Sequence, residues 1–366
     1  MARSRSRATS PPPACCAMVH PGLEEIAAEE IERDLGGEVK RTTEGLVVFR
    51  LPEIEARILE LRTTEDVFLL AWGTDQLTYR AEDLDKIQRW TAREPDWQEL
   101  LRIHHAIRPR PKGKPTYRLV TQMTGHHAYL RRDAGKAMAR GLAGHFPDSW
   151  RPAEENASVE VWLSINEATA VCALRLSDRT MRHRDWKLEH LPASLRPTMA
   201  AAMIRLAGAH GGQLVLDPMC GAGTILAEQL VAAERARQAI HVVGGDIEVP
   251  AVRAAAANLR RLGGESLAHW DATRLPIASS VVDHVVSNPP FGKQLSSPAL
   301  IRPLYAAMVR EYDRVLRPGG QAVLLASDAA ALSAAVGEVP WKLKRQLRVR
   351  VLGQLARMSA WRKEKK

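Results

Sequence analysis

The stretch LVLDPMCGAGT (residues 214–224) decides the fold, because an apolar run ends there in an acid and a glycine-rich turn. A short apolar run bounded by turn residues predicts a buried strand, and the periodicity after Thr224 predicts a helix. Gly221 and Gly223 let the backbone approach a ligand closely, because glycine has no Cβ. The amides that begin the helix favour an anionic group such as a carboxylate. The stretch therefore predicts a ligand-binding turn.

Strand and helix patterns alternate around this turn over residues 193–366. We expect strands at 214–217, 242–246, 267–270, 282–287 and 321–326, and helices at 193–210, 224–236, 249–262 and 298–316. Two alternating segments, 343–351 and 355–361, predict a closing antiparallel pair. The pattern predicts an α/β fold with an open, mostly parallel sheet and helices on both faces.

The N-terminal half carries shorter elements. We expect strands at 14–19, 45–51, 66–73, 159–165 and 169–176, and helices at 23–35, 52–62, 95–107 and 131–146. The Arg/Ser-rich start ends in three prolines and is predicted to be disordered, and the stretch from Ser177 to Pro192 is charged and aperiodic. The predicted organisation is a tail (1–13), two α/β parts (14–72 and 73–176), a linker (177–192) and a C-terminal domain (193–366).

The composition is typical of a globular protein, with 45% hydrophobic and 26% charged residues among 366. It contains no apolar run of about 18 residues, which argues against a membrane span. The N-terminus lacks the apolar core of a secretory signal. The four cysteines, Cys15, Cys16, Cys172 and Cys220, form no CxxC pair and no array with metal-ligand spacing. We therefore expect a cytoplasmic protein without a structural metal.

The positive charge is concentrated in two segments. Residues 102–151 carry eleven Lys and Arg against two acids, and residues 342–366 carry ten against one. Such concentrations on a chain whose net charge is only +10 predict a polyanionic partner. The alternative is a solvated surface that keeps the protein soluble. In the first segment the candidate nucleic-acid contacts are Arg108, Arg110, Lys112, Lys114, Arg131, Arg132, Lys136 and Arg140.

Acids close three successive predicted strands. Asp217 precedes the glycine turn and can accept from a cationic amino group. Asp246, 23 residues after Gly223, stands where an acid binds ribose hydroxyls, and Asp271 can accept from an adenine amine. A dinucleotide fingerprint would place a third glycine where Leu226 stands, so the pattern favours a nucleoside that carries an amino acid. Each acid alone is more often a helix cap or a surface residue.

The motif NPPFG (residues 288–292) follows the strand predicted at 282–287. An exocyclic amine is a poor nucleophile, because its lone pair is delocalised into the base. The Asn288 side-chain oxygen and the Pro289 carbonyl can accept its two N–H groups and orient the nitrogen. Phe291 offers a ring on which a base can stack. The alternative is a proline-rich turn that merely ends a strand.

These motifs resemble those of Rossmann-fold methyltransferases that modify amino groups. The segment LEHLPASLRPTMAAAM (residues 188–203) is similar to the one that precedes the glycine turn in THUMP-domain RNA guanine-N2-methyltransferases. The C-terminal resemblance covers about half of the chain, whereas the N-terminal half matches the family's ferredoxin-like and THUMP RNA-binding parts more loosely. Ala222 stands where the family often has serine, which leaves the backbone contacts unchanged.

The resemblance implies an S-adenosylmethionine-dependent enzyme that acts as a monomer on the N2 amine of a tRNA guanosine, at position six of the acceptor stem in similar enzymes. Alternatives are ribosomal or small nuclear RNA, adenine-N6 or protein-glutamine methylation, and a catalytically idle RNA-binding adapter. The implied catalytic residues are Asn288, Pro289, Pro290 and Phe291. The implied cofactor contacts are Ala193, Ser194, Leu195, Asp217, Cys220, Gly221, Gly223, Thr224, Asp246, Ile247, Asp271, Ala272 and Asn288. No catalytic role is expected for Cys220.

Overall fold

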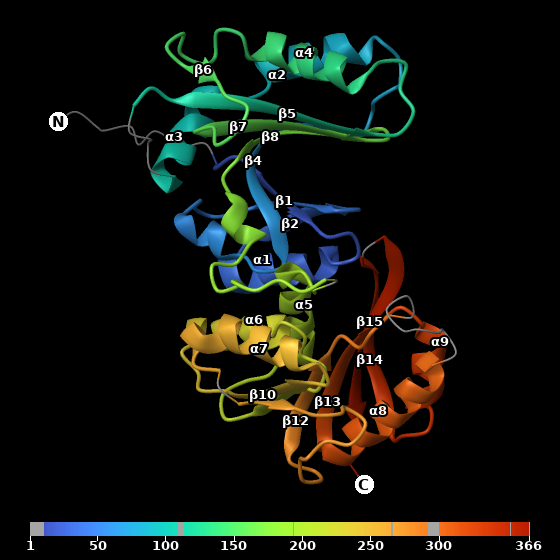
Figure 1. Ribbon diagram of the computed structural model, residues 1–366. Coiled ribbons are helices and arrows are strands. Elements are labelled where there is room, and N and C mark those ends of the chain that lie inside the picture. Colours follow the sequence, from blue (N-terminus) through green and yellow to red (C-terminus); the bar gives the residue numbers. More distant parts are fainter. Residues whose placement is uncertain are drawn as a thin grey trace, which may run out of the picture. The chain divides into compact units, whose positions relative to one another are not determined.

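The computed structural model describes residues 11–108, 113–192, 194–264, 266–291, 300–351 and 353–365. The chain divides into two compact units (Figure 1). The first comprises Met1–Met18 and Ala28–Met181, and the second comprises Val19–Ala27 and Arg182–Lys366. The division after Met181 falls inside the stretch 177–192 for which we predicted a linker.

The first unit is built on one eight-stranded sheet in the order β2-β3-β1-β4-β8-β7-β5-β6. Its strands are β1 (Cys15–Val19), β2 (Glu38–Thr43), β3 (Leu46–Arg50), β4 (Thr64–Thr74), β5 (Thr116–Thr124), β6 (Arg151–Pro152), β7 (Val159–Asn166) and β8 (Thr169–Arg175). Its helices are η1 (Ala56–Glu60), α2 (Asp83–Arg93), α3 (Trp97–Ile107), α4 (Arg131–Leu142) and η2 (Arg179–Met181). The boundary predicted between residues 72 and 73 falls inside β4, which pairs with β8 in the same sheet.

The thiols of the first unit lie in its core. Cys15 and Cys16 are at most 1% exposed, and Cys172 is fully buried. Burial raises the pKa of the Cys15 thiol to about 12. Because the thiolate is the reactive form, these cysteines behave as small core residues.

The second unit is built on a seven-stranded sheet in the order β11-β10-β9-β12-β13-β15-β14. Its strands are β9 (Leu214–Asp217), β10 (His241–Asp246), β11 (Leu267–His269), β12 (Val282–Ser287), β13 (Leu316–Ala326), β14 (Trp341–Val351) and β15 (Gln354–Lys363). The first five run parallel, and β15 joins β13 antiparallel. This sheet confirms the predicted Rossmann-like architecture and its closing antiparallel pair.

Helices cover both faces of this sheet (Figure 1). They are α5 (Pro197–Ala207), α6 (Thr224–Arg235), α7 (Val249–Leu259), η3 (Arg260–Leu262), α8 (Ile301–Val315) and α9 (Ala329–Val336). Val215 packs in the cluster that contains α5 and α6 residues, whereas its neighbour Leu216 packs in the cluster of α8 and α9. Neighbouring side chains on a strand point to opposite faces, so the apolar residues of β9 are buried on both faces of the sheet.

Helix α1 (Glu24–Leu35) is divided between the two units. Leu23, just before the helix, and Ile26 belong to the core cluster of the second unit.

None of the described helices is long and apolar enough to cross a membrane.

The prediction of a helix over residues 52–62 is wrong, because only the short 3-10 helix η1 forms there. Ile58 is the one buried residue of η1, and short helices depend on packing for their stability. The described elements without a prediction include β2, α2 and α9. Strand β2 has one apolar side chain among six residues, and α9 is mostly alanine, so neither gives a clear hydrophobic period.

Candidate active site

A cavity of about 730 Å³ lies at the carboxyl ends of the parallel strands of the second unit. This edge is where ligands bind in open α/β sheets. Its lining comes from the segment before α5, the end of β9 with the glycine turn, the start of α6, the ends of β10 and β12, the turn after β11, and one residue of α8. The lining residues are Leu191, Pro192, Ser194, Leu195, Asp217, Pro218, Met219, Cys220, Gly221, Ala222, Thr224, Ile225, Asp246, Ile247, Glu248, Asp271, Ala272, Asn288, Pro290 and Leu304.

Most of the predicted cofactor contacts therefore meet at one place. Gly223 is an exception among the described ones, because it does not line the cavity. Its φ is +75°, and a Cβ there would lie 3.1 Å from Ala255 on α7. Glycine is required at this position for backbone conformation and close helix packing. Ala193 lies outside the described residues.

Asp217 is a buried acid at the end of β9. Its Oδ1 accepts a hydrogen bond of 2.9 Å from the Ser287 hydroxyl. Burial, together with the nearby charge of Asp246, raises the pKa of the carboxyl group to about 7. A cationic ligand group would stabilise the ionised form, so the residue suits the ammonium group predicted from the sequence.

Asp246 organises the turn as well as lining the cavity. Its Oδ2 accepts from the amide of Gly221 at 2.9 Å, and its Oδ1 accepts from the amide of Glu248 at 3.1 Å. A carboxylate has about four acceptor positions, so lone pairs remain for ribose hydroxyls. Glu248 is a fourth acid on the cavity wall, beside Asp217, Asp246 and Asp271. Sequence reasoning missed it, although it stands only two residues after a predicted contact.

The Asp271 turn is tied to the glycine turn by a neighbouring tryptophan. The Trp270 indole donates to the carbonyl of Pro218 at 3.0 Å. Asp271 uses Oδ1 to accept from the amide of Thr273 at 2.8 Å. The contact from Trp270 explains why the third acid and Ala272 reach the same cavity as the first.

The side-chain oxygen of Asn288 is the atom of the site that most directly indicates a ligand. Its side-chain oxygen is buried and has no hydrogen-bond partner within the described part of the chain. Pro290 lines the cavity beside it, and the Pro290 carbonyl accepts from the Tyr305 hydroxyl at 3.3 Å. A buried acceptor without a partner costs free energy, on the order of 1–3 kcal/mol. It is expected where a ligand supplies the missing donor.

The structure corrects the prediction for Phe291. Its ring is only 3% exposed and belongs to the core cluster beneath the sheet, so it presents no open face for a base. An aromatic side chain gains more by burial than by exposure, and the sequence pattern does not distinguish the two fates. Pro289 is buried and does not line the cavity, and the predicted role of its carbonyl remains a prediction. Gly292 lies outside the described residues.

The segment predicted as a linker is hydrogen-bonded to the cavity wall and to the start of α6. Lys187 donates to the Leu195 carbonyl at 2.9 Å and to the Thr224 hydroxyl at 3.2 Å. Burial lowers the pKa of its ammonium group to about 8. Arg184 forms a buried ion pair of 3.0 Å with Glu228 on α6. These contacts hold the cavity wall around Leu195 against the helix that starts at Thr224.

Asn258 on α7 joins the segment predicted as a linker to the glycine turn. Its Oδ1 accepts from the amides of Leu188 and Glu189 at 2.7 and 2.8 Å. Its Nδ2 donates to the carbonyls of Glu189 and Ala222 at 3.1 and 2.8 Å. Sequence reasoning missed Asn258 and Lys187, because their partners lie far away in the chain.

We expect Asn258→Ala to lower the free energy of unfolding by about 3 kcal/mol, because it leaves buried amides and carbonyls without partners. Urea denaturation followed by circular dichroism measures the change. Arg253→Ala on the same helix is the control: its side chain is exposed, so the free energy of unfolding should stay within about 0.5 kcal/mol of wild type. Equal stability of wild type and Asn258→Ala would contradict this account of the segment.

The predicted RNA contacts of the first unit are mostly exposed. Four of them, Arg131, Arg132, Lys136 and Arg140, project from α4, and Lys114 is exposed as well. Arg108 is paired with Asp178 at 2.8 Å, which partly neutralises it. Arg110 and Lys112 lie outside the described residues.

The comparison with protein families concerns the second unit. The description "RMKL-like, methyltransferase domain" matches residues 184–357, which include every described residue that lines the cavity. Residues 184–357 are thus similar to the RMKL-like methyltransferase domain. The predicted methyltransferase class, with S-adenosylmethionine as methyl donor, is thereby confirmed for this domain.

Relatives of the methyltransferase domain are known by name. The tRNA (guanine(6)-N2)-methyltransferase of Thermus thermophilus is 29% identical over 328 residues, 87% of this chain and 91% of that one. The tRNA (guanine(6)-N(2))-methyltransferase THUMP3 of Mus musculus is 31% identical over 226 residues, 57% of this chain and 43% of that one. The U6 snRNA (guanine-N(2))-methyltransferase THUMPD2 of Homo sapiens is 30% identical over 218 residues. This chain spans about two fifths of the length of these mammalian relatives.

A solved structure matches nearly the whole chain, including the part before the methyltransferase domain. The crystal structure of TrmN from Thermus thermophilus has a TM-score of 0.77 at 25% identity, covering 96% of this chain and 99% of that one. The fold of both units is therefore shared with this neighbour.

Proposed function

We propose that the protein transfers a methyl group from S-adenosylmethionine to the exocyclic N2 amine of a guanosine in structured RNA. Nucleotide six of the tRNA acceptor stem is the first candidate. The proposal includes a monomeric enzyme that acts in the cytoplasm and a first unit that serves as a ferredoxin-like and THUMP-like RNA-binding part. The names of relatives that act on tRNA guanosine support this choice.

The observation that carries the proposal is the buried oxygen of Asn288 beside the cavity, which has no hydrogen-bond partner among the residues that the structure describes. An exocyclic amine has two N–H groups, and accepting one of them turns the nitrogen lone pair toward the cofactor side of the cavity. A hydroxyl or carboxylate substrate would make poorer use of an oriented acceptor. The target base must leave its stack to reach this atom, as in other enzymes that modify bases.

The residues of the cavity fit S-adenosylmethionine. Asp217 is placed for the ammonium group, and the amides after the glycine turn are placed for the carboxylate. Asp246 and Glu248 offer acceptors for ribose hydroxyls, and Asp271 offers one for the adenine amine. When bound, the cofactor supplies an electrophilic methyl group. This chain's own contribution is to bind it, to orient the amine through Asn288 and to exclude water.

The experiment is incubation of the protein with labelled S-adenosylmethionine and total RNA, followed by size fractionation and nucleoside analysis. The expected result is label in the tRNA fraction that migrates as N2-methylguanosine. Label in N6-methyladenosine, in a protein, or in no macromolecule would contradict the proposal. The relatives named for U6 snRNA favour small nuclear RNA as the second candidate, and label in that fraction would select it.

We expect the exposed side of α4 to contribute to RNA affinity. Arg131 and Lys136 are exposed there and have no ion pair within the described residues. The variant Arg131→Ala/Lys136→Ala should reduce the slope of log affinity against log salt by about two. Lys40→Ala/Arg41→Ala is the matched control, since these exposed cations on β2 already pair with Glu38 and Asp75. Filter binding over a salt series measures both, and equal slopes would remove α4 from the interface.

A further inference from the structure

The β14–β15 hairpin carries cations on the face opposite to its buried side chains. Leu347 and Val349 of β14 pack in the core cluster with Leu23 and Ile26, so one face of the strand is covered. The alternate residues Arg348 and Arg350 are exposed. Side chains alternate between the faces of a strand, so Arg348 and Arg350 share the face opposite to Leu347 and Val349.

Two arginines stand directly opposite each other on this face. Arg348 of β14 is paired in register with Arg357 of β15. Like charges in directly opposed positions destabilise a sheet. No ion pair joins Arg348, Arg350 or Arg357 to an acid within the described residues, whereas Arg345 on the same strand reaches Glu25 at 3.0 Å. The repulsion between Arg348 and Arg357 is thus not offset by an ion pair within the described residues. We call Arg348, Arg350 and Arg357 the hairpin tip.

Strand register places the hairpin tip at the edge of the sheet that carries the candidate active site. Ser287, just before Asn288, is level with Leu324 of β13. Two residues further along β13, Ala326 is level with Arg357 of β15. Residues 354–356 and their partners on β14 extend the hairpin past the end of β13 on the same side.

The distance across the strands from Asn288 to the hairpin tip is short. The strands follow one another in the order β12-β13-β15-β14, so two to three strand spacings separate Asn288 from the hairpin tip. At a spacing of roughly 4.8 Å, this is about 10–15 Å. An RNA strand that places one base at Asn288 would therefore carry its neighbouring phosphates across Arg348, Arg350 and Arg357.

We propose that the hairpin tip binds the RNA backbone phosphates that flank the target nucleotide. This inference rests on the proposed function, because it takes the substrate of the same site to be RNA. The guanidinium groups suit phosphate, which they bind through two parallel hydrogen bonds. A bound phosphate also relieves the repulsion between Arg348 and Arg357, so the energetic cost of this pair is recovered only in the complex.

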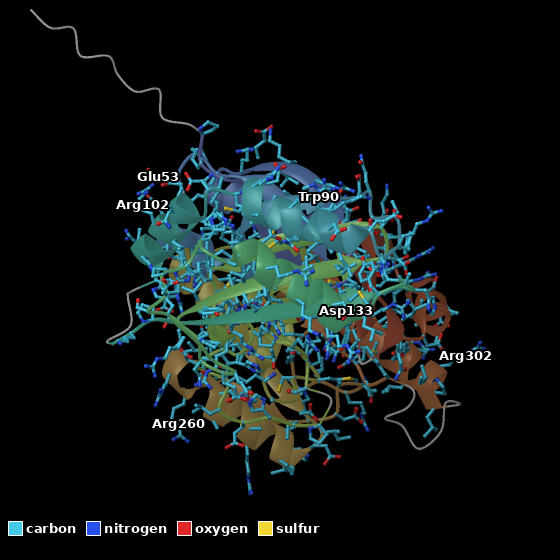
Figure 2. All side chains as sticks on the ribbon, turned by 90° about the horizontal axis from the view of Figure 1, so that it is seen from above. Glu53, Trp90, Arg102, Asp133, Arg260 and Arg302 are labelled. Atoms are coloured by element: carbon cyan, nitrogen blue, oxygen red, sulfur yellow. The ribbon has the colours of Figure 1, made fainter. Side chains whose placement is uncertain are left out.

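The test compares Arg348→Ala/Arg357→Ala with a control that removes two arginines from the same unit. Arg260 and Arg261 are exposed in η3, after α7 has run back to the opposite edge of the sheet. Figure 2 labels Arg260, whose side chain points outward from the ribbon. The measurements are KM and kcat for RNA methylation, the salt dependence of RNA affinity, calorimetric binding of S-adenosylhomocysteine, and thermal stability.

We expect the tip variant to raise KM for RNA by about tenfold and to lower the salt slope by about two, with cofactor affinity unchanged. Its melting temperature should equal or exceed that of wild type, because a repulsive pair is removed. The control variant should leave KM and slope unchanged. An active wild type with a tip variant that matches the control overturns this inference alone. A wild type that binds the cofactor and labels no RNA overturns the proposed function and this inference with it.

Discussion

Asn288→Ala is expected to lower kcat for methyl transfer by about a thousandfold, while the affinity for S-adenosylhomocysteine stays within about threefold of wild type. Removing one oriented polar group from a transition-state site typically costs this much. The Asn288 oxygen is buried and accepts no hydrogen bond from the described residues, so its removal leaves none of their donors without a partner. Single-turnover kinetics with labelled cofactor measures the transfer step, and calorimetry measures the binding step.

The control is Asn156→Gly in the first unit. Asn156 is exposed and has a φ of +50°, a conformation that glycine adopts without strain, so this variant should match wild type in both measurements. A parallel loss of cofactor affinity and turnover in Asn288→Ala would mean that the residue holds the cofactor rather than the target amine.

Asp217→Asn is expected to weaken cofactor binding by about a hundredfold, because losing one member of a buried charge pair costs roughly 2–5 kcal/mol. The effect depends on pH in a definite direction. Burial raises the pKa of Asp217 to about 7, so in the free protein the carboxyl group is mostly protonated at pH 6. The ligand's ammonium group prefers the ionised form. Affinity should therefore increase as the pH rises through 7.

The size of the pH effect follows from the ionised fraction. With a pKa of about 7, the ionised fraction rises from roughly 0.1 at pH 6 to roughly 0.8 at pH 7.5, and the ligand's amino group keeps its proton up to about pH 8. Calorimetry with S-adenosylhomocysteine should show about an eightfold gain in affinity for wild type over this interval and none for Asp217→Asn. A flat wild-type profile would contradict the pairing of Asp217 with the ammonium group.

The parts of the site that could be predicted are local in sequence. The glycine turn and the acids at successive strand ends each depend on a few neighbouring residues, and the parallel sheet brings its strand ends to one edge. Asp217, Asp246 and Asp271 therefore meet at the cavity as expected. The C-terminal fold was predictable for the same reason, since long apolar periods define its helices and strands.

The parts that could not be predicted depend on contacts between distant residues. Asn258 joins residues 36 and about 70 positions away, and nothing in its own neighbourhood distinguishes it from a surface asparagine. Lys187 lies in a charged stretch that looks like a linker until Leu195 and Thr224 are placed beside it. The prediction that the Phe291 ring is open to a base was wrong, because a motif gives the order of residues and does not show which side chain points into the core.

The measurement that tests the central claim most directly uses a synthetic RNA of the sequence that the enzyme labels, with inosine in place of the labelled guanosine. Inosine lacks only the exocyclic amino group. The account predicts that this RNA binds with nearly the affinity of the parent and receives no methyl group. Methylation of the inosine-containing RNA at the substituted nucleotide would contradict the claim that Asn288 orients an exocyclic amine for transfer.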